Sequence, residues 1–253
     1  MILDKFKLDG KVAIVTGASR GLGKAMAVGL AEAGADLALV ASTSTEAGLK
    51  QIQTLGRKAC VIQADLHRPE AVAKIVETTL NEFGRIDILV NNAGIIRRAS
   101  VLDFTEKDWD DVIQINQRSL FFLSQAVARQ MVKQGQGGKI INIASMLSFQ
   151  GGIQVGAYTA SKSAVMGLTR LMANELAGQG INVNAIAPGY METDNTAALR
   201  ADAKRNAEIL GRIPAGRWGA PEELQGAVVF LASDASDYMH GYTLAVDGGW
   251  LAR

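Results

Sequence analysis

The sequence predicts an α/β protein built on one doubly wound parallel sheet. Two observations lead to this prediction: short apolar runs alternate with longer amphipathic runs, and a glycine-rich turn follows the first apolar run. A helix must carry the chain back before the next parallel strand can begin, so this alternation favours parallel strands with helices on both faces. No linker or low-complexity stretch divides the 253 residues, and we expect a single domain over residues 1–253.

The predicted strands are short runs of apolar residues, as is typical of strands that are buried on both faces of a sheet. The first is the KVAIVT run, which leads directly into the glycine turn, and the last is TLAV near the end of the chain. In chain order the strands are predicted at residues 11–16, 37–41, 58–63, 86–91, 139–144, 181–186 and 243–246.

The predicted helices lie between these strands and repeat their apolar residues at three- and four-residue intervals. Pro69 stands at the beginning of one of them, where its fixed φ and missing N–H suit a first helical turn. In chain order the helices are predicted at residues 24–33, 45–55, 69–83, 106–134 with a break at 116–119, 157–176 and 221–231.

Composition excludes several classes of protein. The chain carries 26 Lys and Arg against 25 Asp and Glu, so it has no bulk charge with which to hold nucleic acid. A single cysteine, Cys60, excludes an internal disulfide framework, and the two histidines lack metal-ligand spacing, so no metal is predicted. Because no signal peptide or apolar run of about 18 residues is seen, we expect a cytoplasmic protein that does not bind membranes.

The glycine-rich turn is the first candidate site. It stands between a strand and a helix near the start of a βαβ unit, as in a Rossmann-type domain that binds a dinucleotide. Glycines let the backbone approach a pyrophosphate, and the N-terminus of the following helix stabilises its negative charge. The residues expected to contact the cofactor here are Gly17, Ser19, Arg20, Gly21, Leu22 and Gly23.

A second candidate site consists of Ser145, Tyr158 and Lys162. Tyr158 and Lys162 are four residues apart on a predicted helix and so share one face. A nearby ammonium favours the phenolate, which predicts a lowered pKa for Tyr158 and a role in proton transfer. Ser145 follows the fifth strand at the carboxyl edge, where open α/β sheets place ligands, and its hydroxyl can hold a substrate oxygen.

Five motifs in this order resemble the short-chain dehydrogenase/reductase family, and the resemblance covers essentially the whole chain. They are the glycine turn Thr16–Gly23, the acidic residue in Asp65-Leu66, the sequence Asn91-Asn92-Ala93-Gly94, the set Asn116, Ser145, Tyr158 and Lys162, and the pair Pro188-Gly189.

The resemblance implies that a hydride passes between a nicotinamide and a carbonyl or alcohol carbon. Tyr158 would transfer the proton and Ser145 would orient the substrate oxygen. Lys162 would lower the pKa of Tyr158 and bind the nicotinamide ribose, and Asn116 would hold a water next to Lys162. The further positions that it implies for the cofactor are Asp65, Leu66, Asn92, Ala93, Gly94, Pro188 and Gly189, together with Tyr158 and Lys162.

A narrower resemblance is to the sugar-acid dehydrogenases of this family. It rests on residues 95–98, 145–152, 212–219 and 246–253. A sugar acid carries a carboxylate, and an arginine can bind it through a bidentate pair of hydrogen bonds. Arg97 is the expected partner, with Arg98 as the alternative. Further substrate contacts are predicted, with weaker support, at Gln150, Met191 and Trp218, alongside Ser145 and Tyr158.

The end of the second strand predicts NADP(H) in preference to NAD(H). An NAD-specific chain usually has an acidic residue there to bind the adenine ribose, but this chain has Ala41. Arg20 offers a cation for a 2′-phosphate, and Ser42 and Thr43 offer hydroxyl donors. A dual preference remains an alternative.

Residues 188–219, named here the lid segment, are predicted to be an irregular insertion that covers the substrate site. The alternative is a surface loop that does not cover the site. In the family that the chain resembles, the helix over residues 157–176 and the helix before it pack across a twofold axis. The resemblance therefore implies a homotetramer.

Two other functions are alternatives to the hypothesis of a sugar-acid enzyme. A 3-oxoacyl-[acyl-carrier-protein] reductase has a similar cofactor loop, but its acidic partner needs a basic docking patch. On the helix before residues 157–176, Arg129 and Lys133 are the only obvious basic pair. A non-catalytic dinucleotide sensor on the same fold typically lacks the tyrosine or the lysine, and this chain keeps both. We therefore favour the sugar-acid enzyme.

Overall fold

The structure is a computed structural model that describes all residues 1–253 and contains one sheet of seven parallel strands. The strand order is β3-β2-β1-β4-β5-β6-β7, which confirms the predicted doubly wound sheet. The order reverses between β1 and β4, and open α/β sheets bind ligands at such a switch point. The strands are β1 Val12–Thr16, β2 Asp36–Ala41, β3 Ala59–Gln63, β4 Ile88–Asn91, β5 Gly138–Ile143, β6 Ile181–Pro188 and β7 Thr243–Val246.

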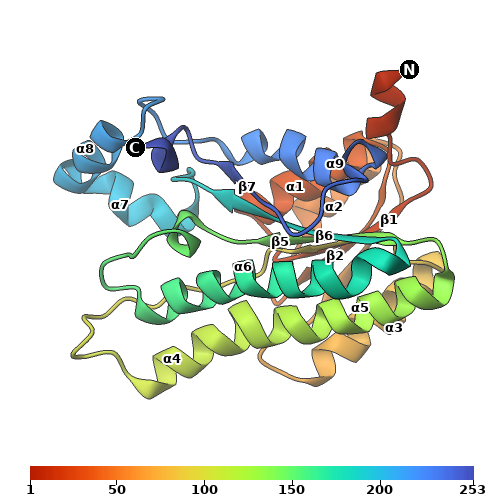
Figure 1. The fold of residues 1–253 in the computed structure, drawn as a ribbon, viewed down its shortest axis with the longest axis horizontal. Coiled ribbons are helices and arrows are strands. Elements are labelled where there is room, and N and C mark those ends of the chain that lie inside the picture. The colour runs from red at the N-terminus through yellow and green to blue at the C-terminus, as the bar shows by residue number, and fades with distance from the viewer.

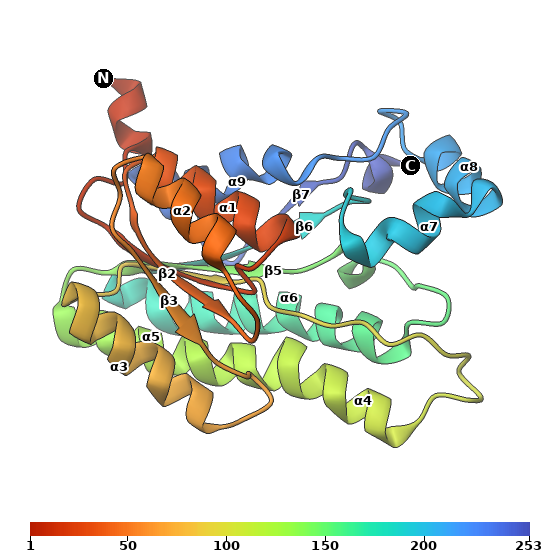
Figure 2. The same ribbon diagram turned by 180° about the vertical axis from the view of Figure 1, so that it is seen from behind.

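Helices cover both faces of the sheet. In Figure 1, α1, α2 and α9 lie on one face, whereas α3, α4, α5 and α6 lie on the other; Figure 2 shows the same two layers from behind. The α-helices are α1 Gly21–Glu32, α2 Glu46–Thr54, α3 Glu70–Phe83, α4 Glu106–Ile113, α5 Leu120–Gln134, α6 Gly156–Leu176, α7 Ala197–Ala201, α8 Ala203–Arg212 and α9 Gln225–Ala232.

Alternation along each strand divides the apolar core into two layers. Successive side chains of a strand point to opposite faces of a sheet. Ala13 and Val15 accordingly belong to the core beneath α1 and α9, whereas Ile14 belongs to the core against α3, α5 and α6. Burial on both faces explains why these strands read as continuous apolar runs.

The structure corrects the predicted break at residues 116–119. There α4 and α5 are joined without interruption by a π-helix, η2 Gln114–Ser119, so the chain stays helical from Glu106 to Gln134. A π-helical turn inserts an extra residue into a helix and is frequent at functional sites. The polar residues that interrupt the apolar period at this point make side-chain hydrogen bonds.

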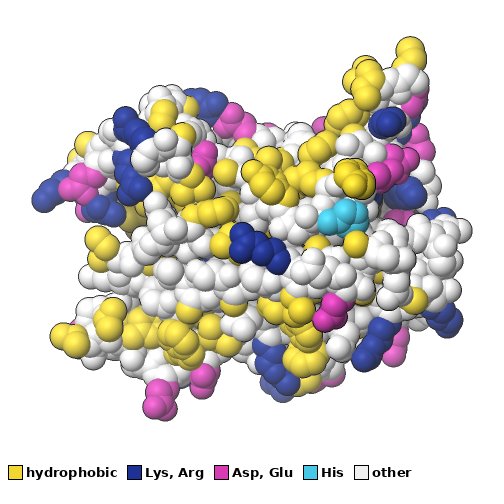
Figure 3. Space-filling model, in the orientation of Figure 1, with side chains coloured by type: hydrophobic (Ala, Val, Ile, Leu, Met, Phe, Trp, Pro, Cys, Tyr) yellow, Lys and Arg dark blue, Asp and Glu magenta, His cyan; other side chains and the backbone are white.

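The lid segment is more regular than predicted. It contains α7 and α8, and a short parallel bridge between Met191 and Gly219 closes its two ends. Figure 1 shows α7 and α8 as an arm that projects beyond the sheet. Figure 3 shows cationic side chains on this arm, which carries Arg200, Lys204, Arg205 and Arg212.

None of the helices is both long enough and apolar enough to cross a membrane.

Candidate active site

The turn after β1 is held in place by the strand beside it. The Thr16 hydroxyl accepts hydrogen bonds from the backbone N–H groups of Asn92 and Ala93, each at 3.0 Å. In return, the Asn92 side-chain amide donates to the carbonyls of Thr16 at 2.9 Å and Gly17 at 3.2 Å. The structure therefore gives Asn92 a structural role that sequence reasoning missed, because the residues that bond here are 74 or more positions apart in the chain.

The glycine turn packs so closely against its neighbours that a side chain at Gly23 would not fit. A Cβ atom on Gly23 would lie 2.2 Å from the carbonyl oxygen of Gly17 and 2.4 Å from the Asn92 amide nitrogen. Gly17 and Gly21 have φ angles of 66° and 53°, in the left-handed region that favours glycine. The N-terminus of α1 opens at Gly21 with its free N–H groups, so the turn fits a dinucleotide pyrophosphate.

The residues expected on the adenosine side lie around the ends of β2 and β3. Ser42 is exposed just beyond β2, and Asp65 is exposed just beyond β3. The backbone N–H and the ring of His67 bond the Asp65 carboxylate and hold its pKa below the usual value. The Leu66 carbonyl accepts a hydrogen bond from the Ser119 hydroxyl, which ties this loop to η2.

Arg20 lies between the glycine turn and the lid segment. Its guanidinium forms an ion pair with Asp194 at 3.2 Å, and both side chains are largely exposed. Exposed pairs of this kind contribute about 0.2–1 kcal/mol, so Arg20 is available to another anion.

Ser145 and the catalytic helix meet at the carboxyl edge of the sheet. Ser145 is buried directly after β5, and its Oγ accepts a hydrogen bond from the backbone N–H of Leu147 at 3.1 Å. Lys162 is 4% exposed, its Nζ donates to the carbonyl of Ile143 at 2.6 Å, and it lies 5.7 Å from the centre of the Tyr158 ring. The structure thus brings the three predicted residues together, with α6 supplying two of them.

The predicted direction of the Tyr158 pKa is wrong for this structure. Burial raises the pKa of Tyr158, while the nearby Ser145 hydroxyl and the Arg98 charge lower it to a smaller extent. Burial also lowers the pKa of Lys162 to about 8. The Lys162 ammonium donates its hydrogen bond to the Ile143 carbonyl and not to the phenol.

Asn116 lies within η2 and fastens the loop that follows β4. Its Oδ1 accepts from the Ile95 N–H at 2.8 Å, and its Nδ2 donates to the Ile95 carbonyl at 2.9 Å. The same Nδ2 donates to the Ser161 hydroxyl on α6 at 3.2 Å. Asn116 therefore joins the Asn91–Gly94 motif to the helix that carries Tyr158, and its water-binding role stays a prediction.

The substrate role expected of Arg97 does not fit its surroundings. Its guanidinium lies 3.4 Å from a carboxylate oxygen of Asp108 and 3.8 Å from one of Asp111, both on α4. Arg98 is exposed, donates to the backbone carbonyl of Asn195 in the lid segment at 3.5 Å, and acts on the Tyr158 pKa. The geometry therefore favours Arg98, which the sequence left as the alternative.

The three weaker substrate candidates are engaged in packing or in pairing within the protein. Met191 and Trp218 are 5% and 7% exposed, and the Trp218 indole donates to the Asn206 side chain at 2.7 Å. The Gln150 side-chain oxygen accepts from Arg212 of α8 at 2.9 Å. Met191 and Trp218 therefore pack within the protein, and Gln150 links the lid segment to the loop after β5. Their contacts with a substrate stay a prediction.

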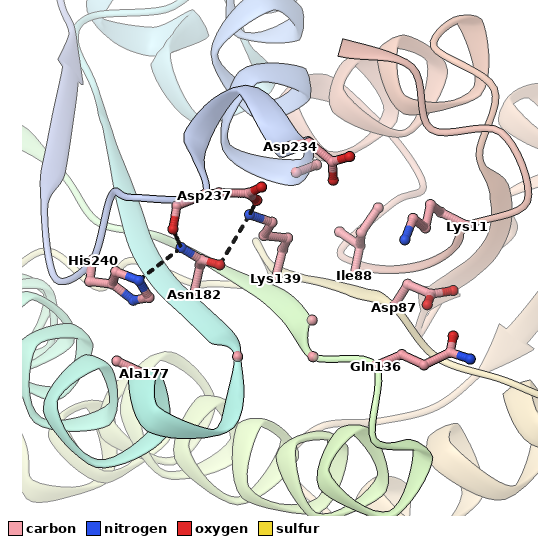
Figure 4. Close-up of a pocket in the computed structure, with 14 residues that line it drawn as sticks. Lys11, Asp87, Ile88, Gln136, Lys139, Ala177, Asn182, Asp234, Asp237 and His240 are labelled. Carbon is pink, nitrogen blue, oxygen red and sulfur yellow. Dashed lines mark hydrogen bonds and ion pairs between the residues drawn. The ribbon is translucent and has the colours of Figure 1, made fainter. Parts of the chain in front are cut away.

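A polar cavity of about 390 Å³ lies at the opposite, amino edge of the sheet. Figure 4 shows Lys139 between Asn182 and Asp237, and His240 bonded to Asn182. Lys139 Nζ lies 2.7 Å from Asp237 and 3.0 Å from Asn182, so the buried ammonium is satisfied by the protein itself. This cavity contains none of the predicted site residues.

The fold, the glycine turn and the Ser145–Tyr158–Lys162 set define a nicotinamide-dependent oxidoreductase. The sequence profile described as enoyl-(acyl carrier protein) reductase matches residues 17–251. The chain belongs to the short-chain dehydrogenase/reductase family and is an NAD(P)-dependent dehydrogenase/reductase.

Among its relatives, 2-dehydro-3-deoxy-D-gluconate 5-dehydrogenase of Dickeya dadantii is 62% identical over 253 residues, which cover both chains completely. A solved structure from Agrobacterium tumefaciens, described as a 2-deoxy-D-gluconate 3-dehydrogenase with bound NADP, is 54% identical. It covers 99% of this chain and 100% of its own, with a TM-score of 0.94. A gluconate 5-dehydrogenase of Burkholderia cenocepacia, solved with NADP and tartrate, is 41% identical over the whole of both chains, with a TM-score of 0.93.

Proposed function

We propose that this protein is a sugar-acid dehydrogenase that interconverts 2-dehydro-3-deoxy-D-gluconate and 3-deoxy-2,5-diketo-D-gluconate. The observation that carries the proposal is the position of Arg98, a cation without a carboxylate partner whose charge acts on Tyr158. A substrate with an anionic end for Arg98 and a secondary alcohol for Tyr158 suits these two residues. The Dickeya relative, a 2-dehydro-3-deoxy-D-gluconate 5-dehydrogenase with 62% identity over the full chain, supports the same substrate.

The chain's own residues provide the proton chemistry. The nicotinamide, when bound, supplies the hydride acceptor for alcohol oxidation. Tyr158 in its phenolate form removes the hydroxyl proton, and the Ser145 hydroxyl holds the same oxygen. Lys162 carries its charge beside the Tyr158 ring and stabilises the phenolate when that form develops. In reduction, Tyr158 returns its proton to the carbonyl oxygen.

We also propose that NADP(H) is preferred. Arg20 supplies an exposed cation, Ser42 supplies a hydroxyl, and the buried Ala41 at the end of β2 leaves no acid to bind a ribose. Two structural relatives that were solved with NADP support this choice.

The remaining proposals concern the setting of the enzyme. We propose a cytoplasmic homotetramer in which the lid segment covers the substrate. Trp109, Phe122 and Leu171, on α4, α5 and α6, are each between 41% and 43% exposed, and Figure 3 shows apolar side chains over this region. Exposed apolar residues on neighbouring helices support an interface between subunits. Val165 and Met172, by contrast, are buried against their own sheet.

The test is a turnover screen at 340 nm. Purified protein is supplied with NAD+ or NADP+ and a panel of aldonic and deoxy-aldonic acids, and with NADPH and a β-ketoacyl thioester. Turnover of 2-dehydro-3-deoxy-D-gluconate is expected. Activity on the thioester alone would instead make the protein an oxoacyl reductase.

Tyr158→Phe separates an enzyme from a cofactor sensor. The variant is expected to lose at least about 100-fold in kcat, because a positioned proton donor contributes 10²–10⁴-fold. Cofactor binding, measured by fluorescence titration, should stay within about twofold of wild type. Wild-type protein that binds the cofactor but turns over nothing in the panel would favour the sensor.

A further inference from the structure

The short turn η3 Met146–Ser148, which directly follows Ser145, contains a second buried serine. Ser148 is 7% exposed, and its hydroxyl has two partners. Its Oγ accepts a hydrogen bond from the backbone N–H of Ser145 at 3.3 Å and donates one to the backbone carbonyl of Lys162 at 2.6 Å. One hydroxyl therefore joins the main chains of two residues of the candidate catalytic set.

We propose that Ser148 is a positioning residue that sets the distance between Ser145 and the catalytic helix. Ser145 follows β5, whereas Tyr158 and Lys162 lie on α6, so the relative position of the two groups depends on contacts across this junction. Ser148 bonds to backbone atoms on both sides of the junction. This inference rests on the proposed catalytic roles of Ser145, Tyr158 and Lys162.

The geometry of Ser145 explains why such a contact matters for the reaction. A serine hydroxyl has one hydrogen to donate and two lone pairs to accept with. The Leu147 N–H occupies one lone pair of Ser145 Oγ, which leaves the other lone pair and the hydrogen for the Tyr158 phenol and the substrate oxygen. A shift of the Ser145 backbone would move this hydrogen relative to the Tyr158 phenol, and a displacement of about 1 Å can cost 10²-fold in rate.

A second and weaker contact spans the same junction. The Ser163 hydroxyl of α6 donates to the Leu147 carbonyl at 3.4 Å, and Ser163 is exposed. The Ser163 hydroxyl makes no hydrogen bond to the backbone of Ser145 or Lys162. The positioning role is therefore assigned to Ser148, and Ser163→Ala on α6 provides a comparison across the same junction.

The experiment compares Ser145→Ala, Ser148→Ala and the double variant with 2-dehydro-3-deoxy-D-gluconate as substrate. Ser148→Ala is expected to lower kcat by about 10-fold while the cofactor KM stays within twofold. In the Ser145→Ala background, measured at micromolar enzyme concentration, the same change should have less than a twofold effect, because nothing remains for Ser148 to position. Ser148→Thr, which keeps the hydroxyl, should restore kcat to within about threefold of wild type.

Two controls separate positioning from general damage. Ser236→Ala removes another buried serine hydroxyl with two backbone partners, in the 3-10 helix η7 Asp234–Ser236, and should leave kcat within twofold. The primary deuterium isotope effect on kcat, measured with substrate deuterated at the oxidised carbon, should stay the same or increase in Ser148→Ala.

The outcomes distinguish this inference from the function on which it rests. Unchanged kcat in Ser148→Ala, or an equal loss in both backgrounds, would overturn the positioning role even if Ser145→Ala abolishes turnover. The positioning role would also be overturned if Ser148→Ala and Ser148→Thr both lose thermal stability and Ser148→Thr does not recover kcat. Full activity in Ser145→Ala would instead overturn the proposed catalytic set.

Discussion

Replacing Arg98 with alanine tests how the protein recognises an acid substrate. The guanidinium has no carboxylate partner and makes one long contact, at 3.5 Å, to the Asn195 carbonyl. Hydrogen bonds to charged groups contribute about 1.5–3 kcal/mol, so losing the substrate carboxylate contact should lower kcat/KM for the acid by about 10- to 150-fold. A neutral polyol or lactone analogue lacks that contact and should lose far less.

The same substitution has a second effect that can be measured separately. The positive charge of Arg98 lowers the pKa of Tyr158, so its removal should raise that pKa further. Alcohol oxidation needs the phenolate, and its pH–rate profile should therefore move to higher pH for acid and neutral substrates alike. This shift does not depend on where the substrate carboxylate binds.

Arg97→Ala is the matched control, because Arg97 is already paired with Asp108 and Asp111. Steady-state kinetics with both substrates should show a loss below about threefold. A loss for the acid that equals or exceeds that of Arg98→Ala would place the carboxylate at Arg97. An equal loss for acid and neutral substrates in Arg98→Ala would remove Arg98 from carboxylate binding.

Three further predictions concern the cofactor site and the buried lysine. Gly23→Ala should weaken NADP+ binding by at least about 10-fold in a fluorescence titration, because its Cβ would lie 2.2 Å from the Gly17 carbonyl oxygen. Gly178→Ala is the control and should leave NADP+ binding unchanged, because a Cβ at Gly178 would lie in open space. Arg20→Ala should raise the KM for NADP+ by about 10-fold and leave that for NAD+ within twofold, and equal effects would exclude a 2′-phosphate contact.

Lys162→Met should be inactive but more stable than wild type in urea at pH 7. Burial lowers the Lys162 pKa from 10.5 to about 8, so the folded state binds fewer protons than the unfolded state between these values. Its destabilisation, at most about 3 kcal/mol, is fully present below pH 8 and fades as pH rises to 10.5. Loss of the hydrogen bond to Ile143 offsets about 1 kcal/mol of the stability gained in Lys162→Met. A difference in the free energy of unfolding between variant and wild type that does not change with pH would contradict this account.

Local sequence patterns predicted the fold and the main parts of the site. The β1 run, the glycine turn and the four-residue spacing of Tyr158 and Lys162 were all found where expected. Helix and strand periods depend on residues close together in the chain, and a turn with positive φ needs glycine wherever the chain goes next. The predicted break at residues 116–119 failed because a π-helix stays helical despite an apolar period that is out of step.

The directions of side chains depended on partners far away in the chain. Which arginine is free near Tyr158 follows from the acids on α4 and from Asn195, 97 residues beyond Arg98. The Tyr158 pKa follows from burial, which spacing along a helix does not reveal. By itself, the sequence determined the parallel sheet and the glycine turn, because these depend on local backbone preferences, and it supplied the candidate reactive groups. Only the tertiary structure decided the pKa shifts of Tyr158 and Lys162 and the hydrogen-bond partners of the site residues, because these depend on which elements pack together.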